Sequence, residues 1–376
     1  MGERRQLTVV QVLPALDGGG VERGTLEVAA ALVRNGHRSL VISGAGHQVP
    51  RLEAAGSRHI CWPLGRKSPL SLRWIGPLRR LLARENVAIL HARSRMPAWI
   101  AWLAWRGMPP AHRPRFITTV HGLYAVNAYS AVMTKGERVI AVSRHARDYL
   151  LANYPDLSPG RVTVIPRGVD PSQYPAGYRP DAAWQADWYR QYPETRGRYL
   201  LALPGRVVRR KGVLDFIEII RQLAAGGVPV HGLLVGEHPS GRHAGFLREC
   251  RTRIAAAGLE GQISFTGHRN DLREILSISA AVLSLSLHPE SFGRTVNEAL
   301  SLGRPVAGYA HGGVGEQLAE LFPAGRVPVG DTAGMARLLS AWQKTTPPVG
   351  AIRPAILDAM QASTLALYES IARTDR

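Results

Sequence analysis

The sequence of 376 residues contains only two cysteines, no long apolar run and far fewer acidic than basic residues. Cys61 and Cys250 lie far apart without metal-ligand neighbours, so neither a disulfide framework nor a metal site is expected. The N-terminus passes from Gly-Glu-Arg-Arg into a short apolar run at 7–13 without a signal-peptide core, and no run reaches the roughly 18 apolar residues of a spanning helix. We therefore expect a cytoplasmic protein without a transmembrane segment.

The charge balance is strongly basic, with 47 Lys and Arg against 28 Asp and Glu and a formal net charge of +19. Such an excess indicates an anionic partner, such as nucleic acid, a membrane surface or an acidic polymer, unless a high genomic GC content has raised the arginine count. A basic nucleic-acid-binding protein is one alternative function. Aromatic residues are sparse outside one tryptophan-rich segment and no RNA-binding motif occurs, so we expect no nucleic-acid partner.

Strand-like apolar runs alternate with helical patterns and glycine turns along both halves of the chain. This alternation predicts an α/β protein with two Rossmann-like doubly wound parallel-sheet domains, and the length is sufficient for two cores. We place the N-terminal domain at 1–175 and the C-terminal domain at 176–354, with a Pro-, Tyr- and Trp-rich linker region at 171–193.

Two strand ends in the first half carry candidate ligand contacts. The run 7–13 leads to Gly19 and Gly20, which permit close backbone approach by a ligand, although the turn lacks the GxGxxG spacing of a dinucleotide site. Glu22 follows, either as an acceptor contact or as an acidic residue that favours its own helix dipole. The run 116–120 delivers His121 at a strand end, where parallel sheets bind ligands; a buried histidine bonded to the backbone is the alternative.

The segment 66–115 combines positive charge with tryptophan. The pattern predicts a basic amphipathic helix at 70–86, followed at 96–106 by three Trp at a spacing of three. Such a segment suits an anionic membrane interface, whereas helices packed on the sheet, with the Trp rings in a core, are the alternative. Its basic residues are Arg66, Lys67, Arg73, Arg79, Arg80, Arg84, Arg93, Arg95, Arg106, Arg113 and Arg115.

A turn between an apolar strand at 281–285 and an amphipathic helix starting near Arg294 is the candidate catalytic site. A helix N-terminus offers backbone N–H groups and a partial positive charge to an anion, and Gly293 has no side chain to keep the anion away. Glu290 precedes the helix and Glu298 lies about one turn inside it, so both carboxylates can accept hydrogen bonds from a polyol. An anion beside a polyol indicates a nucleotide sugar, with solvated helix carboxylates as the alternative.

Arg206 and Lys211 frame a second loop, at 205–212, between a strand and a helix. A planar guanidinium and an ammonium five residues apart can clamp a diphosphate and neutralise the charge that develops on a departing nucleotide. Arg209 and Arg210, which lie between them, are expected to be solvated.

The spacing of Glu290 and Glu298, with seven residues between them, resembles the EX7E motif of retaining glycosyltransferases of the GT-B fold, family 4 (glycosyltransferase group 1), such as bacterial lipopolysaccharide and cell-envelope glycan enzymes. The Gly-Arg and Lys-Gly pairs at Arg206 and Lys211 match the same family. The resemblance covers nearly the whole chain. It implies that the two domains face a central cleft and that a C-terminal helix at 355–376 packs back on the first domain.

The resemblance also implies the roles of individual residues. Glu290 is expected to bind hydroxyls of the donor sugar, Glu298 the ribose, and Gly267 the nucleobase through its backbone. No metal or other cofactor is expected, because Arg206, Lys211 and the helix dipole take the metal's role and no Asp-x-Asp site is visible. The catalytic set is His121, Glu290, Arg206 and Lys211, and the donor-binding set is Gly19, Gly20, Arg206, Lys211, Gly267, Ser291, Phe292, Gly293 and Glu298.

The implied activity is that of a hexosyltransferase-type enzyme. It would move a sugar from a UDP- or GDP-sugar to a glycan or glycolipid acceptor, in lipopolysaccharide or other envelope polysaccharide assembly. A nucleotide-sugar epimerase or hydrolase of the same fold is the alternative. The basic segment predicts that the enzyme is a peripheral protein on the anionic inner leaflet of the membrane.

Overall fold

The computed structural model describes residues 6–237, 244–350 and 356–373. The chain divides into two compact units: unit 1 consists of Met1–Arg167 and Leu357–Arg376, and unit 2 of Gly168–Ile356. The first boundary falls a few residues before the 175/176 boundary predicted from the sequence. Each unit has its own parallel sheet and its own core.

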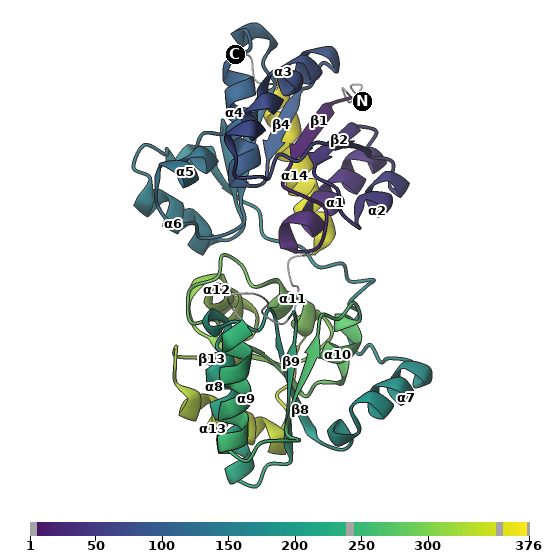
Figure 1. Ribbon diagram of the computed structural model, residues 1–376, viewed down its shortest axis with the longest axis vertical. Coiled ribbons are helices and arrows are strands. Elements are labelled where there is room, and N and C mark those ends of the chain that lie inside the picture. The colour runs from purple at the N-terminus through teal and green to yellow at the C-terminus, as the bar shows by residue number, and fades with distance from the viewer. Residues whose placement is uncertain (1–5, 238–243, 351–355, 374–376) are drawn as a thin grey trace. The chain divides into compact units, whose positions relative to one another are not determined.

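Unit 1 is built on a seven-stranded sheet in the order β3-β2-β1-β4-β5-β6-β7, with parallel pairing throughout (Figure 1). β1 is buried along its whole length, as expected of a central strand covered on both faces. The order reverses between β1 and β4, which makes this the switch point of the sheet. The strands are β1 Thr8–Val12, β2 Arg38–Ser43, β3 Arg58–Cys61, β4 Ile89–Ala92, β5 Arg115–Val120, β6 Arg138–Ala141 and β7 Val162–Val164.

The helices of unit 1 come from both ends of the chain. They are α1 Gly20–Arg34, α2 Val49–Ala54, α3 Ile75–Arg84, α4 Arg95–Arg106, α5 Ala128–Ala131, α6 Arg144–Asn153 and α14 Leu357–Arg373. Met360, Leu365 and Tyr368 of α14 share a core with Leu7 and Val9, and the yellow α14 lies among the purple elements of this unit in Figure 1. The last described helix is therefore part of the first unit's core.

The single helix predicted at 70–86 is wrong in its extent. The structure has a 3-10 helix η1, Pro69–Trp74, followed by α3 from Ile75. Pro77 is the reason, because it lacks a backbone N–H and is tolerated in the first turn of a helix but not in its interior. One continuous helix from residue 70 would place this proline in its second turn.

Unit 2 is built on a six-stranded parallel sheet in the order β10-β9-β8-β11-β12-β13, with its switch point between β8 and β11. Its strands are β8 Tyr199–Pro204, β9 Val230–Val235, β10 Ile263–Gly267, β11 Ala281–Ser284, β12 Val306–Tyr309 and β13 Arg326–Val327. Its helices are α7 Ala182–Gln191, α8 Val213–Ala225, α9 Ala244–Ala256, α10 Leu272–Ile278, α11 Arg294–Ser301, α12 Gly312–Leu321 and α13 Thr332–Lys344. The two parallel sheets confirm the predicted class of two doubly wound α/β halves.

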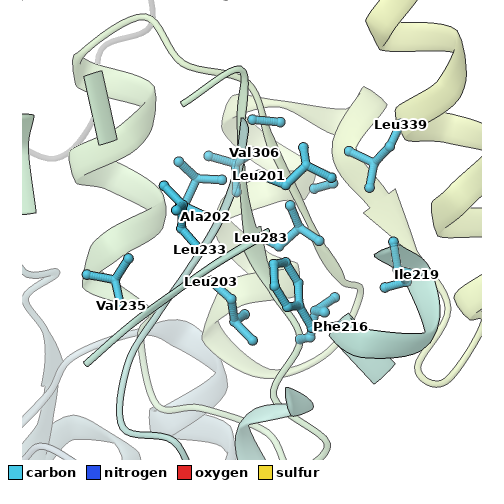
Figure 2. Packing of buried hydrophobic residues seen from close by; sticks show 14 of the residues in the cluster. Leu201, Ala202, Leu203, Phe216, Ile219, Leu233, Val235, Leu283, Val306 and Leu339 are labelled. Atoms are coloured by element: carbon cyan, nitrogen blue, oxygen red, sulfur yellow. The ribbon is translucent and has the colours of Figure 1, made fainter. Parts of the chain in front are cut away.

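The core of unit 2 forms where the central strands meet α8 and α13 (Figure 2). Figure 2 labels Leu201, Ala202, Leu203, Phe216, Ile219, Leu233, Val235, Leu283, Val306 and Leu339. Val169, Tyr174 and Trp188 belong to the same core. The region predicted as a linker is therefore an integral part of unit 2, because its aromatic side chains bury apolar surface there.

Candidate functional site

Two loops meet at the switch point of the unit 2 sheet. One follows β8 and the other follows β11, and Leu287 N donates to Arg210 O at 2.9 Å between them. Gly212 makes the close approach possible: its φ is 71°, and a Cβ there would lie 2.0 Å from Leu285 O. Because ligands of open α/β sheets bind beyond the carboxyl ends of the strands at such a point, these loops form the candidate site.

Lys211 and Glu290 face each other across this contact. Lys211 Nζ donates to Glu290 Oε1 at 2.7 Å, and the side chains are 22% and 21% exposed, so the pair is partly shielded from water. Ser286 Oγ donates to the same carboxylate oxygen. Burial by itself would raise the pKa of Glu290, but the Lys211 charge and the hydrogen bonds from Lys211 and Ser286 outweigh it and hold this pKa below its usual value. Glu290 is therefore an ionised carboxylate at neutral pH.

The loop that carries Glu290 is fixed from the side of α12. Gly313 N donates to Glu290 O at 2.7 Å, and His311 Nε2 donates to Ser286 O at 2.7 Å. Gln317 Nε2 donates to Phe292 O and, at 3.1 Å, to Gly313 O. These bonds order the backbone on both sides of the carboxylate, so the Lys211–Glu290 pair is held in place before any substrate binds.

Gly293 ends this loop and begins α11. Its φ of 88° is left-handed, and a Cβ would lie 2.5 Å from Val314 Cγ2, so a larger residue does not fit. The first backbone N–H groups of α11 therefore follow directly after the Glu290 loop. The N-terminus of α11, which follows Glu290 in the chain, favours an anion, and a diphosphate is an anion of the kind that helix N-termini bind.

The other residues predicted in this half occupy different surroundings. Arg206 is exposed in the loop after β8, as expected for a group that meets a ligand from solvent. Gly267 is the last residue of β10, with φ 70°. Glu298 is only 2% exposed, and its Oε1 accepts from Arg294 Nε at 3.1 Å within α11. Ser291 is partly exposed, whereas the Phe292 side chain is 7% exposed, so a ligand would meet residue 292 through its backbone.

In unit 1, His121 follows β5 and is held by Arg167. Arg167 Nη2 donates to His121 Nδ1 at 2.6 Å and to Gly20 O at 3.1 Å. A guanidinium only donates, so Nδ1 is the acceptor and the proton of the neutral ring sits on Nε2. Burial, followed by the charges of Arg167 and Arg93, lowers the pKa of His121 well below its usual value. His121 is therefore a neutral imidazole with its proton on Nε2.

Gly19 and Gly20 lie at the exposed start of α1. A Cβ at Gly19 would lie 2.7 Å from Glu22 Oε2, so the Glu22 carboxylate folds back over the N-terminus of its own helix. This geometry favours the interpretation of Glu22 as a residue that stabilises the helix dipole.

A buried polar network that was not predicted from the sequence includes His91 and Arg93, whose charges act on His121. His91 Nδ1 is 2.6 Å from Tyr368 Oη, and its Nε2 is 2.6 Å from Thr119 Oγ1. Arg93, 2% exposed, donates from Nε to Gln11 Oε1 at 2.7 Å. The partners come from β1, β4, β5 and α14, so hydrogen bonds tie the last helix to the middle of the sheet.

The tryptophan-rich helix α4 uses its rings to pack. Trp99 Nε1 donates to Tyr129 O at 2.9 Å, and Trp105 Nε1 donates to Pro114 O at 2.7 Å. Both indole N–H groups are thus satisfied within unit 1. For these two rings the structure favours the packed interpretation over a lipid contact.

Across 6–237, 244–350 and 356–373, no group of three or more His, Cys, Asp or Glu side chains is arranged to hold a metal ion. Over the same residues, no helix combines the length and the apolar character needed to span a bilayer.

The chain has two doubly wound parallel sheets, and one of them has a Lys–Glu pair at its switch point. This is the architecture of a GT-B transferase. Two family models match successive parts of the sequence: Glycosyltransferase Family 4 over residues 18–173, and Glycosyl transferases group 1 over residues 185–344. The chain belongs to this family of glycosyltransferases. The predicted family and the GT-B fold are confirmed, and the family is one of transferases.

Individual proteins show the same relationship. A glycosyltransferase from Rickettsia africae is 27% identical and has a TM-score of 0.84, covering 99% of this chain and 100% of its own. Anabaena HepE in complex with UDP-glucose is 18% identical with a TM-score of 0.80, covering 97% of this chain and 100% of its own, which shows the shared fold. The 2-deoxystreptamine N-acetyl-D-glucosaminyltransferase of Streptomyces fradiae is 30% identical over 227 residues, 59% of this chain and 51% of that protein. The chain thus spans about half the length of this curated relative.

Proposed function

We propose that the protein transfers a sugar from a nucleoside-diphosphate-sugar, a UDP- or GDP-sugar, to a glycan or glycolipid acceptor with retention at the anomeric carbon. The observation that carries the proposal is the Lys211–Glu290 pair, 2.7 Å long and partly shielded, at the N-terminus of α11 and at the switch point of the sheet. It joins a cation and a helix N-terminus, which suit a diphosphate, to an ionised carboxylate, which suits sugar hydroxyls. The complex of Anabaena HepE with UDP-glucose supports this class of donor.

Each predicted residue then has a physical task. Arg206, Lys211 and the first N–H groups of α11 neutralise the charge that grows on the diphosphate as the glycosidic bond breaks, so the reaction requires no metal. Glu290 accepts hydrogen bonds from donor-sugar hydroxyls and orients the anomeric carbon. Glu298 serves the ribose. His121, a neutral ring after β5, is the candidate sugar contact of unit 1.

The proposed acceptor belongs to lipopolysaccharide or another envelope polysaccharide, met at the cytoplasmic face of the inner membrane. Leu70 and Leu72 of η1 are 72% and 46% exposed, and the exposed cations Lys67 and Arg73 flank them. Apolar side chains among cations suit the headgroup region of an anionic leaflet, where each cation contributes about 1 kcal/mol. The predicted surface contact thus centres on η1 rather than on the Trp rings of α4.

A melting-temperature screen tests the donor. The full chain is heated alone and with UDP-, GDP-, ADP- and dTDP-sugars, because a ligand that binds the folded state raises Tm by mass action. We expect one base series to stabilise the chain and the Lys211→Ala variant to lose that gain. If no nucleoside diphosphate sugar raises Tm, the proposal fails.

A further inference from the structure

The carboxyl-terminal edge of the unit 1 sheet is basic at strand after strand. Five segments follow β3, β4, β5, β6 and β7, at 62–68, 93–98, 121–127, 142–147 and 165–167, and their sequences contain no Asp or Glu. Their basic residues are Arg66, Lys67, Arg93, Arg95, His121, Arg144, His145, Arg147 and Arg167. Since ligands of parallel sheets bind at this edge, its basic residues favour an anionic ligand.

Two of these cations share one aromatic ring. Arg95 Cζ lies 5.2 Å from the ring centroid of Tyr129, and Lys67 Nζ lies 5.8 Å from the same centroid. Arg95 also lies 4.5 Å from the Tyr124 ring and donates to Ser130 Oγ at 3.2 Å. Aromatic faces and a hydroxyl therefore hold these two positive charges close together.

Tyr124 joins this pair to His121. Burial raises the pKa of the Tyr124 phenol, which hydrogen-bonds with the His121 backbone and lies in the fields of Arg95 and Arg167. Tyr149 Oη fixes the segment by donating to Tyr124 O at 2.6 Å. Lys67, Arg95, Tyr124 and His121 thus form one cluster, called here the basic cluster.

We propose that the basic cluster binds a phosphate group carried by the acceptor, with Lys67 and Arg95 as its cationic contacts. Neighbouring like charges repel each other, and a phosphate anion bound between them offsets that repulsion. A guanidinium offers paired N–H donors that match phosphate oxygens, and Lys67 is exposed, so it can follow a ligand. The term acceptor rests on the proposed function, whereas phosphate binding by the cluster can be measured independently of transfer.

The phosphate has two possible sources, and two binding assays on the full chain distinguish them. Calorimetry with glucose 6-phosphate, glucose and glucosamine tests a soluble sugar phosphate. Sedimentation with phosphatidylcholine vesicles, with and without phosphatidylinositol, tests a lipid phosphate. UDP is kept at saturation so that the diphosphate site in unit 2 is occupied. We expect glucose 6-phosphate or the phosphatidylinositol vesicles to bind, and glucose and glucosamine not to bind.

Matched variants locate the binding. Lys67→Ser with Arg95→Gln should weaken phosphate binding at least about tenfold, the loss expected when a charge-assisted contact is removed. Lys67→Ser alone, at an exposed position, should weaken it without affecting folding. The control is Arg38→Gln with Arg58→Gln, which removes two half-exposed cations from the amino-terminal edge of the same sheet and should leave binding unchanged.

Three results would overturn the proposal: no phosphate binding in either assay, equal weakening by the control pair, or loss of binding in Lys211→Ala but not in the cluster variant. If no nucleoside diphosphate binds the wild-type chain, the proposed donor function fails. Even then, loss of phosphate binding in the Lys67→Ser, Arg95→Gln variant but not in the control pair would support phosphate binding by the basic cluster.

Discussion

Replacing Lys211 by Ala removes the cation that holds Glu290 ionised in the unit 2 site. The two side chains are joined at 2.7 Å and are 22% and 21% exposed, so water screens the contact less than it screens a surface ion pair worth about 1 kcal/mol or less. In the proposed reaction Lys211 also faces the growing charge of the diphosphate. Loss of one such preorganised contact costs about 3 kcal/mol, or about a hundredfold in kcat/KM.

The substitution should also change the pH dependence. Burial favours the neutral form of Glu290, and without Lys211 less positive charge opposes it, so the pKa of Glu290 rises. Because the ionised carboxylate is the active form, the acid limb of the activity profile moves to higher pH. The deficit of the variant should therefore be larger at pH 5 than at pH 8.

The assay follows nucleoside diphosphate release from the stabilising donor between pH 5 and 8. Lys211→Arg keeps the charge and should retain both the acid limb and more activity than Lys211→Ala. The Tm measured without ligand checks that each variant is folded. Near-normal turnover of Lys211→Ala, or an acid limb that does not move, would refute the assignment of this pair.

Three further outcomes follow from the structure. Glu298→Ala should weaken donor binding more than it lowers kcat, as a ribose contact would, and calorimetry together with kinetics separates the two; unchanged donor affinity would contradict that role. Burial holds the pKa values of His91 and His121 well below normal, so below about pH 6.5 the unfolded chain binds more protons than the folded chain. The unfolding free energy should therefore be flat above that pH and fall below it, by up to about 1.4 kcal/mol per pH unit for each histidine. A urea series that shows no such fall would argue against neutral buried rings. Gly212→Ala should lower Tm far more than Gly197→Ala. Both glycines have φ near 70°, but only at Gly212 would a Cβ meet a neighbouring carbonyl oxygen, at 2.0 Å. Equal shifts in Tm would rule out this close approach.

The site in unit 2 could be predicted from the sequence because its signals are local. An apolar strand, a turn with Gly293 and an amphipathic helix occupy one continuous stretch, and Lys211 follows the neighbouring strand. Strand order then brings both loops to the same switch point. The contact of Lys211 with Glu290 thus depends on topology that alternation of strands and helices already implies.

Contacts that depend on long-range packing were not predictable in this way. Arg167 is 46 positions from His121, and the sequence does not indicate that it fixes the tautomer of that ring. His91 and Tyr368 are 277 positions apart and meet only because α14 returns to unit 1. Ser286 is different, since it lies two residues after the end of β11 and its position near a strand end was a usable signal.

The anomeric configuration of the product shows whether the transfer is retaining. The full chain is incubated with the donor that raises Tm and with an acceptor, and proton NMR reads the configuration of the new glycosidic bond. We expect the product to keep the anomeric configuration of the donor, and Lys211→Ala to lose the product. An inverted linkage, or undiminished product from Lys211→Ala, would contradict it.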